Sequence, residues 1–194
     1  MSNLAAAEFP ALVSWDEFQN LPEDSLQDGE HYQLHDGQVV LLPRPRPRHK
    51  AVQMQLPRAL RFVEEFDFVV GVEQPYRPAI NYQFWTADVM VLPHSVMQAM
   101  MNQAHWEVYS PPLIIEILSP SDWKRQGENT FHNINKQRIV AMSNGTREFW
   151  VVDADQRTVH VTTTEGAQVY GIGDRIPCSL TPGRSVAVND IFVL

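Results

Sequence analysis

The sequence predicts a single α/β (α+β) domain, in which the order from His49 onward is helix, three strands, helix and strand. Its 194 residues, 44% of them apolar, fit one domain with a core of its own. Three short, continuously apolar runs have the length of strands covered on both faces. One longer stretch repeats apolar residues at spacings of three and four, which indicates an amphipathic helix, and a second helical stretch lies further along the chain. No internal repeat divides the chain, so we expect one domain over residues 1–194.

The composition excludes several classes of protein. Five Trp and nine Phe exclude a disordered or collagen-like chain. The single cysteine, Cys178, permits neither an internal disulfide nor a cysteine zinc site, which favours a reducing compartment, and the cytoplasm is the expected location. The chain has no apolar run long enough for a membrane helix and no basic stretch typical of a signal peptide. We therefore expect no membrane as a partner.

The net charge of -8 is confined to the beginning of the chain. Residues 1–43 hold eight carboxylates and no Lys or Arg, and the other 15 carboxylates balance all 15 basic residues. Residues 1–31 therefore form an acidic N-terminal extension. The total excludes a broadly basic, nonspecific phosphate binder, but it does not exclude nucleic acid as a partner.

The first elements are marked by capping and turn residues. Ser14 lies three residues before Glu17, which is typical of a capped helical turn. The stretch HYQLHDGQVVLL, residues 31–42, predicts a β-hairpin because Asp36-Gly37 supplies the positive φ angles of a tight turn.

A proline-rich basic stretch, PRPRPRHK, follows at residues 43–50 and predicts an extended loop. Its basic residues either contact phosphates or belong to a solvated loop without a partner. From His49 to Phe66, apolar residues at helical spacing predict the first core helix, with a kink at Pro57. His49 either faces a site or caps this helix.

The rest of the chain predicts strands around a second helix. The apolar runs 68–73, 86–92 and 113–118 are expected strands, and residues 128–143 are an expected helix that Asn144-Gly145 ends. The runs 147–153 and 158–164 form the arms of a hairpin, and 168–170 could add another strand.

Two of the apolar strands each contain a carboxylate that their pattern does not predict. Asp88 interrupts TADVMVL, and Glu116 interrupts LIIEIL. Burying such an anion is costly unless a cation or a hydrogen-bond donor meets it. Two carboxylates on adjacent strands could bind Mg²⁺ or Mn²⁺, which prefer oxygen ligands. The alternative for Asp88 is a carboxylate bonded to main-chain amides at a strand end.

Several pieces of the chain resemble the Uma2 family of restriction endonuclease-like proteins, a branch of the PD-(D/E)XK nuclease superfamily. They cover about residues 32–192 and include YQLHDGQVV, ADVMVL, PPLIIEILSPS, REFWVVD and GDRIPCSLTPG, with His49 after the proline-rich loop. The resemblance implies a restriction endonuclease-like core, a mixed β-sheet flanked by helices. An N-terminal β-hairpin and a C-terminal hairpin extend that core.

The resemblance also implies a metal site and a catalytic lysine. Asp88, Glu116 and the main-chain carbonyl of Ile117 would hold Mg²⁺ or Mn²⁺. Leu118 stands where the superfamily has its catalytic lysine, and a helical lysine replaces it in this family. Counting back from REFW places the helical lysine at Lys136, whereas counting forward from SPS places Asn129 at that position. Lys124 is the next candidate after Lys136. Gln33 replaces a family carboxylate.

The implied activity is metal-dependent hydrolysis of DNA phosphodiester bonds, with Asp88, Glu116 and Lys136 as catalytic residues. The resemblance leaves a catalytically degenerate binding protein as the alternative, and a hydrolase of another phosphoester as a third reading. Because one site per chain must serve two strands, we expect a homodimer. The expected DNA contacts are Arg44, Arg46, Arg48, His49, Lys50 and Lys124.

Overall fold

The computed structural model describes residues 12–22, 26, 30–42, 45–80, 82–102, 107–118 and 129–193, except the side chains of 129–133. The strands are β1 (His31–His35), β2 (Gln38–Leu42), β3 (Phe68–Tyr76), β4 (Gln83–Pro93), β5 (Leu113–Leu118), β6 (Glu148–Asp153), β7 (Thr158–Thr163), β8 (Gly166–Tyr170), β9 (Arg175–Pro177) and β10 (Ser185–Ala187). The helices are α1 (Trp15–Phe18), α2 (Pro47–Ala59), the 3₁₀ helix η1 (Arg61–Phe66), α3 (His94–Asn102), α5 (Asn129–Ser143) and α6 (Val188–Ile191).

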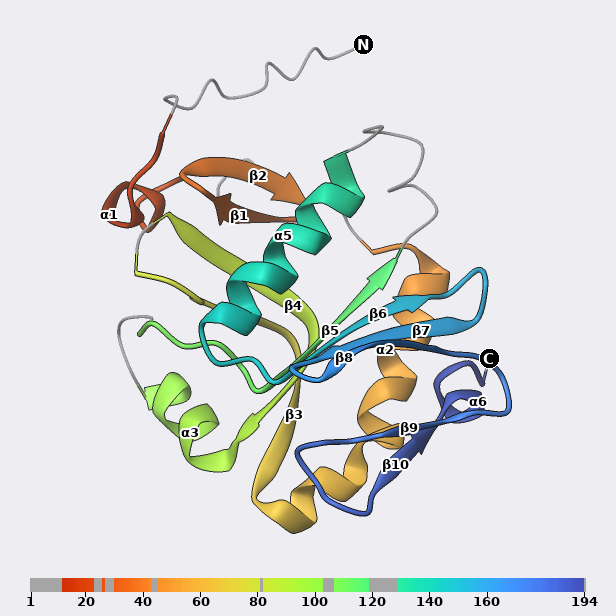
Figure 1. The fold of residues 1–194 in the computed structure, drawn as a ribbon. Helices are drawn as coiled ribbons and strands as arrows, with labels where there is room; N and C mark the ends of the chain where they lie inside the picture. The colour runs from red at the N-terminus through yellow and green to blue at the C-terminus, as the bar shows by residue number, and fades with distance from the viewer. Residues whose placement is uncertain are drawn as a thin grey trace.

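Eight of the strands form one mixed sheet (Figure 1). Its order is β2-β1-β4-β5-β6-β7-β8, and β3 pairs with β4 beside this path. The β5–β6 pair is parallel and is connected through α5, whereas the other pairs are antiparallel. A parallel neighbour requires such a crossover because a tight turn cannot join parallel strands. The mixed sheet flanked by helices confirms the predicted fold class.

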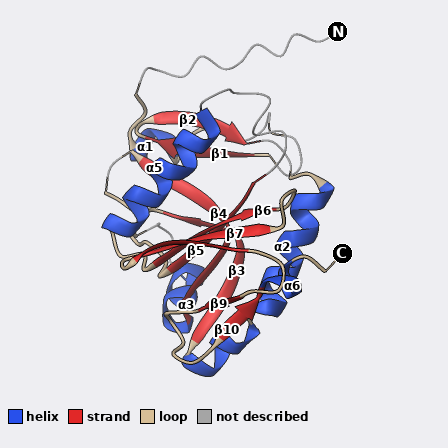
Figure 2. Ribbon diagram, turned by 45° about the vertical axis from the view of Figure 1, so that its right-hand side comes forward, coloured by secondary structure: helices blue, strands red, loops and turns tan. Residues whose placement is uncertain are grey.

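The helices cover the sheet on both faces, with α2 on one side and α5 on the other (Figure 2). On the first face, Val52 and Leu56 of α2 pack with β4–β7 and with the C-terminal β9–β10 hairpin, in which Cys178 is buried. On the second face, Ala141 of α5 packs against a cluster that includes Tyr76 and Phe149. Burial of these apolar side chains is the main stabilising term of the fold.

The predicted N-terminal elements are confirmed. Ser14 and Glu17 form a complete capping box on α1, each side chain bonding the other residue's main chain. Asp36 and Gly37 turn the β1–β2 hairpin with φ angles of 48° and 79°, as a two-residue hairpin turn requires.

The helix after the basic stretch differs from the prediction in both its bounds and its shape. It begins at Pro47, two residues before the predicted start at His49, so Pro47 and Arg48 lie in its first turn and not in an extended loop. Proline is tolerated at the first helical position, where its missing N–H group has no helical partner to bond. Helix α2 continues through Pro57 to Ala59, and a separate 3₁₀ helix covers residues 61–66. The prediction of one helix to Phe66 was therefore wrong.

Helix α3 was absent from the sequence prediction. It follows β4 directly, and its apolar residues Val96, Met97 and Met100 pack against the core without being fully buried. Within the described residues, none of the helices is both long and apolar enough to cross a membrane.

Candidate active site

The sheet divides along β4 at the position of Asp88. Strand β4 pairs with β1 through Gln83 and Phe84, and with β5 through Val89–Val91. In the described strands, residues 85–88 of β4 pair with neither β1 nor β5. Main-chain polar groups in this interval need other partners, because unpaired buried N–H and C=O groups are costly.

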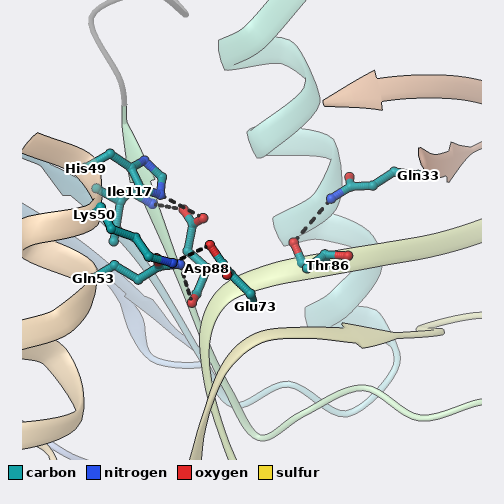
Figure 3. Close-up of polar contacts among 8 residues, drawn as sticks. All are labelled: Gln33, His49, Lys50, Gln53, Glu73, Thr86, Asp88 and Ile117. Carbon is teal, nitrogen blue, oxygen red and sulfur yellow. Dashed lines mark hydrogen bonds and ion pairs between the residues drawn. The ribbon is translucent and has the colours of Figure 1, made fainter. Parts of the chain in front are cut away.

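Side-chain amides bond two of these carbonyls from opposite sides (Figure 3). The Gln33 amide donates to the Thr86 carbonyl at 3.2 Å. The Gln53 amide, from helix α2, donates to the Asp88 carbonyl at 3.0 Å. Both glutamine side chains are buried, so they fix the course of β4 where the ladder is interrupted.

The Asp88 carboxylate joins α2 to β5. Its Oδ1 lies 3.0 Å from Nε2 of His49, and its Oδ2 accepts a hydrogen bond of 2.7 Å from the Ile117 main-chain N–H. If the β4–β5 register continued, Ile117 would lie opposite Ala87, so the carboxylate bonds an amide at the point where the strand pairing ends. One-fifth of the Asp88 side chain is exposed, which leaves it open to a ligand.

Glu116 is the second carboxylate of the site. Val89 pairs with Ile115, so the same register brings Glu116 opposite Asp88. Its Oε1 is buried and has no hydrogen-bond partner among the described residues. Burial, and then the negative charge of Asp88, raise the pKa of Glu116 well above its usual value. A cation would relieve both effects.

A third carboxylate and a lysine lie beside this pair. Lys50 of α2 forms an ion pair of 2.7 Å with Glu73 of β3, and both side chains are partly exposed. The β3–β4 register brings Glu73 opposite Asp88, but Glu73 has a φ of 50° and the pairing skips both residues. One end of α2 thus holds the strand pair through His49, Lys50 and Gln53 (Figure 3).

Two further polar groups are buried next to these carboxylates. Nε2 of His31 and the hydroxyl of Tyr76 have no hydrogen-bond partner among the described residues. Burial lowers the pKa of His31, and the negative charges of Glu73 and Asp88 oppose that shift. Burial and the charge of Glu116 raise the pKa of Tyr76 well above its usual value. Both rings therefore lie within electrostatic reach of the site.

The predicted lysine is engaged elsewhere. The ammonium group of Lys136 forms an ion pair with Asp36, in the turn of the β1–β2 hairpin. The main-chain N–H of Asp36 in turn bonds the side chain of Gln83, five residues before Asp88 on β4. At about 3.3 Å per residue, roughly 16 Å of strand separates those two positions. Lys124 and the side chain of Asn129 lie outside the described residues.

The other expected contacts are distributed around the start of α2. His49 reaches Asp88, and Lys50 reaches Glu73. Arg48 pairs with Asp155 at 2.7 Å, and Arg46 is exposed at the N-terminal end of α2. Arg44 lies outside the described residues.

Leu118 and Gln33, which depart from the family pattern, are both buried. Leu118 is buried, with 5% of its surface exposed, and lies opposite Asp153 in the β5–β6 pair. Gln33 bonds Thr86 and His35, so its side chain supports the strands in place of the family carboxylate.

Sequence reasoning missed Gln53, Glu73, His31 and Tyr76. For Gln53 a usable signal existed, because it stands one turn after His49 on the helix. Glu73 ends the apolar run predicted as a strand, but no neighbouring residue in the sequence indicates its ion pair with Lys50.

The possible metal ligands among the described residues of this site are oxygen atoms, and they do not form a complete coordination sphere. In the described part of the chain, no three His, Cys, Asp or Glu side chains are grouped to hold a metal ion. Two opposed carboxylates suit an ion that keeps waters and takes substrate oxygens as further ligands.

Comparisons with known proteins identify the family and the fold of the chain. The family model for Uma2, described as putative restriction endonuclease, matches residues 15–189. The chain belongs to the Uma2 family. Among solved structures, it is similar to a crystal structure described as a putative nuclease belonging to DUF820 from Anabaena variabilis. The TM-score is 0.72 at 20% identity, over 93% of this chain and 97% of the other. The search of curated proteins gives no match. Membership of Uma2 therefore associates the chain with nucleases in general, and the fold agrees with that.

Proposed function

We propose that this Uma2 protein is an endonuclease that hydrolyses DNA phosphodiester bonds with a divalent metal ion, Mg²⁺ or Mn²⁺. The observation that carries the proposal is the pair of opposed carboxylates, Asp88 and Glu116. Glu116 has a buried oxygen without a hydrogen-bond partner among the described residues, and its pKa is raised by burial and by Asp88. Such a pair is costly as it stands, and a bound cation would offset that cost.

Asp88, Glu116 and the main-chain carbonyl of Ile117 are the proposed ligands. A bound divalent ion would lower the pKa of a water molecule and withdraw charge from the phosphate. Each Asp88 oxygen accepts a single hydrogen bond from the described residues, so each keeps a lone pair for a ligand. His49 and the Ile117 amide hold the carboxylate in one orientation, which is the usual work of groups behind a metal ligand.

The first turn of α2 is the proposed phosphate contact. Arg46, Arg48 and Lys50 bring positive charge to that end of the helix, whose first turn contains no acidic residue, and His49 lies between them. Positive side chains at a helix N-terminus favour phosphate binding. Arg44 and Lys124 complete the proposed set from the sequence. A homodimer, in which each protomer cuts one strand, remains the proposed assembly.

A degenerate binding protein is the competing function. It is favoured by Leu118 at the superfamily lysine position, and by the structural hydrogen bonds that both Asp88 oxygens accept. In that reading Asp88 serves only to bond the Ile117 amide at the strand end.

A cleavage assay separates the two functions. Supercoiled plasmid is incubated with the protein and Mg²⁺ or Mn²⁺, and nicked and linear products are measured on gels. We expect activity that EDTA abolishes and that Asp88→Asn or Glu116→Gln lowers at least about 100-fold. Glu65→Gln, which changes a carboxylate paired with Arg184, is the matched control and should keep full activity. Equal activity in all four proteins would identify a contaminating nuclease, and no activity in any of them would favour the degenerate reading.

A further inference from the structure

The described site contains a cation that the family pattern does not assign. Leu118 is apolar and buried, and the Lys136 ammonium pairs with Asp36 at the Gln83 end of β4. Lys50, in contrast, follows His49 directly in the first turn of α2 and pairs with the carboxylate opposite Asp88. Of these, Lys50 is the one whose ion-pair partner, Glu73, lies opposite Asp88 in the β3–β4 register.

The setting of Lys50 suits a contact with substrate. Its side chain is 44% exposed, so its ammonium group can bond Glu73 and still present N–H groups to an incoming phosphate. His49 and Gln53 bond the side chain and the carbonyl of Asp88, so α2 is fixed against β4 on both sides of Lys50. The position of Lys50 relative to Asp88 is therefore set by three separate contacts (Figure 3).

The conformation of Glu73 supports the same inference. Its φ of 50° lies in the left-handed region, which is unfavourable for a residue with a side chain. Strain of this kind persists where the surrounding structure imposes it, and it clusters at functional sites. Here it breaks the β3–β4 pairing opposite Asp88 and accompanies the ion pair with Lys50.

We propose that Lys50 is the catalytic cation of this site and that Glu73 is the residue that positions it. This inference rests on the proposed nuclease function. The Lys50 ammonium donates a hydrogen bond to a non-bridging oxygen of the scissile phosphate. It stabilises the negative charge that develops there as water attacks, and it transfers no proton. Lys136 then has a structural role, holding α5 to the β1–β2 turn.

The test compares matched lysine variants in single-turnover cleavage of a plasmid. Lys50→Gln should lower the rate at least about 100-fold, Lys50→Arg should restore part of it, and Lys136→Gln should keep the rate within about threefold. Glu73→Gln should lower the rate less than Lys50→Gln does. Thermal unfolding of each variant controls for folding.

A second measurement does not depend on cleavage. Fluorescence anisotropy with labelled duplex DNA and Ca²⁺ reports binding, and Lys50→Gln should weaken it several-fold while Lys136→Gln leaves it unchanged.

The outcomes separate this inference from the function on which it depends. If Asp88→Asn abolishes cleavage but Lys50→Gln does not, the nuclease proposal stands and the assignment of Lys50 is overturned. If Lys136→Gln is the variant that loses activity, the helical lysine of the family serves the site after all. If the wild-type protein cleaves no DNA, both proposals fail together.

Discussion

At the scale of single residues, Asp88 and Glu116 differ in how their environments treat a negative charge. Asp88 accepts hydrogen bonds from the Ile117 amide and contacts the His49 ring. Glu116 has a buried oxygen that no described donor reaches, so burial and the neighbouring charge act on it unopposed. Burial and the charge of Asp88 therefore favour the neutral acid at Glu116, whereas the Asp88 carboxylate has hydrogen-bond partners on both of its oxygens.

The raised pKa of Glu116 predicts a specific dependence of stability on pH. The folded chain binds a proton at Glu116 more tightly than the unfolded chain, whose glutamate has its usual value of 4.5. The contribution of Glu116 to the free energy of unfolding is fully present below pH 4.5. It is lost as the pH rises through the folded-state pKa of Glu116. Glu116→Gln stays neutral throughout.

We therefore expect Glu116→Gln to gain stability relative to wild type as the pH increases from 4.5, measured by thermal unfolding in EDTA. Asp88→Asn should reduce the effect, because it removes the second cause of the shift. A stability difference that does not change with pH would show that Glu116 titrates normally.

At the scale of elements, the site depends on how α2 lies against β3 and β4. Val52 and Leu56 are buried in the cluster on that face, while His49, Lys50 and Gln53 make the polar contacts. Apolar packing holds the helix in place, and the polar contacts set its register on the strands.

Truncation of Leu56 should therefore affect folding before chemistry. Leu56 is fully buried, and Leu56→Ala should lower the free energy of unfolding by about 2–5 kcal/mol, measured in urea. Met54 is 60% exposed on the same helix, and Met54→Ala should change stability by less than about 0.5 kcal/mol. Similar losses in the two variants would contradict the observed orientation of α2.

The strain in β3 predicts an unusual order of stability. Both Glu73→Ala and Glu73→Gly remove the ion pair with Lys50, but only glycine adopts the positive φ without cost. We expect the glycine variant to be the more stable by about 1 kcal/mol, although glycine normally weakens a strand. The same pair of substitutions at Asp67, whose φ is 61°, should show the same order and leave DNA cleavage unchanged. An alanine variant that is the more stable at position 73 would show that this strain is absent.

The sequence could predict what depends on local pattern. Asp88 and Glu116 were identifiable because a carboxylate conflicts with an apolar strand, and the hairpin was identifiable from Asp36-Gly37. The start of α2 was mispredicted because repeated prolines indicate an extended chain, whereas Pro47 opens a helix. The contact of Lys50 with Glu73 joins a helix to a distant strand position, so no spacing in the sequence reveals it.

At the scale of the whole molecule, charge is distributed unevenly along the chain. The first 43 residues carry the entire net charge of -8, and the start of α2 concentrates basic residues near the carboxylates. Arg48 and Lys50 already have carboxylate partners, which limits how many phosphates the surface can neutralise.

This distribution predicts a modest dependence of DNA binding on salt. With about three to five phosphate contacts, the logarithm of the binding constant should fall with the logarithm of salt concentration with a slope of about −3 to −5. Fluorescence anisotropy at fixed Ca²⁺, between 50 and 200 mM KCl, measures it. A slope steeper than about −8 would require a much larger basic surface than α2 provides.

Asp88 and Glu116 are proposed to bind a divalent ion together. Calorimetric titration of Mn²⁺ into the purified protein tests this metal site without any DNA substrate. We expect saturable Mn²⁺ binding that weakens at least about tenfold in both Asp88→Asn and Glu116→Gln, and that is unchanged in Glu65→Gln. Binding should also tighten as the pH rises above 4.5, because the ion must displace the proton that Glu116 retains. Absence of saturable binding to the folded wild-type chain, or equal binding in all four proteins, would contradict this proposal.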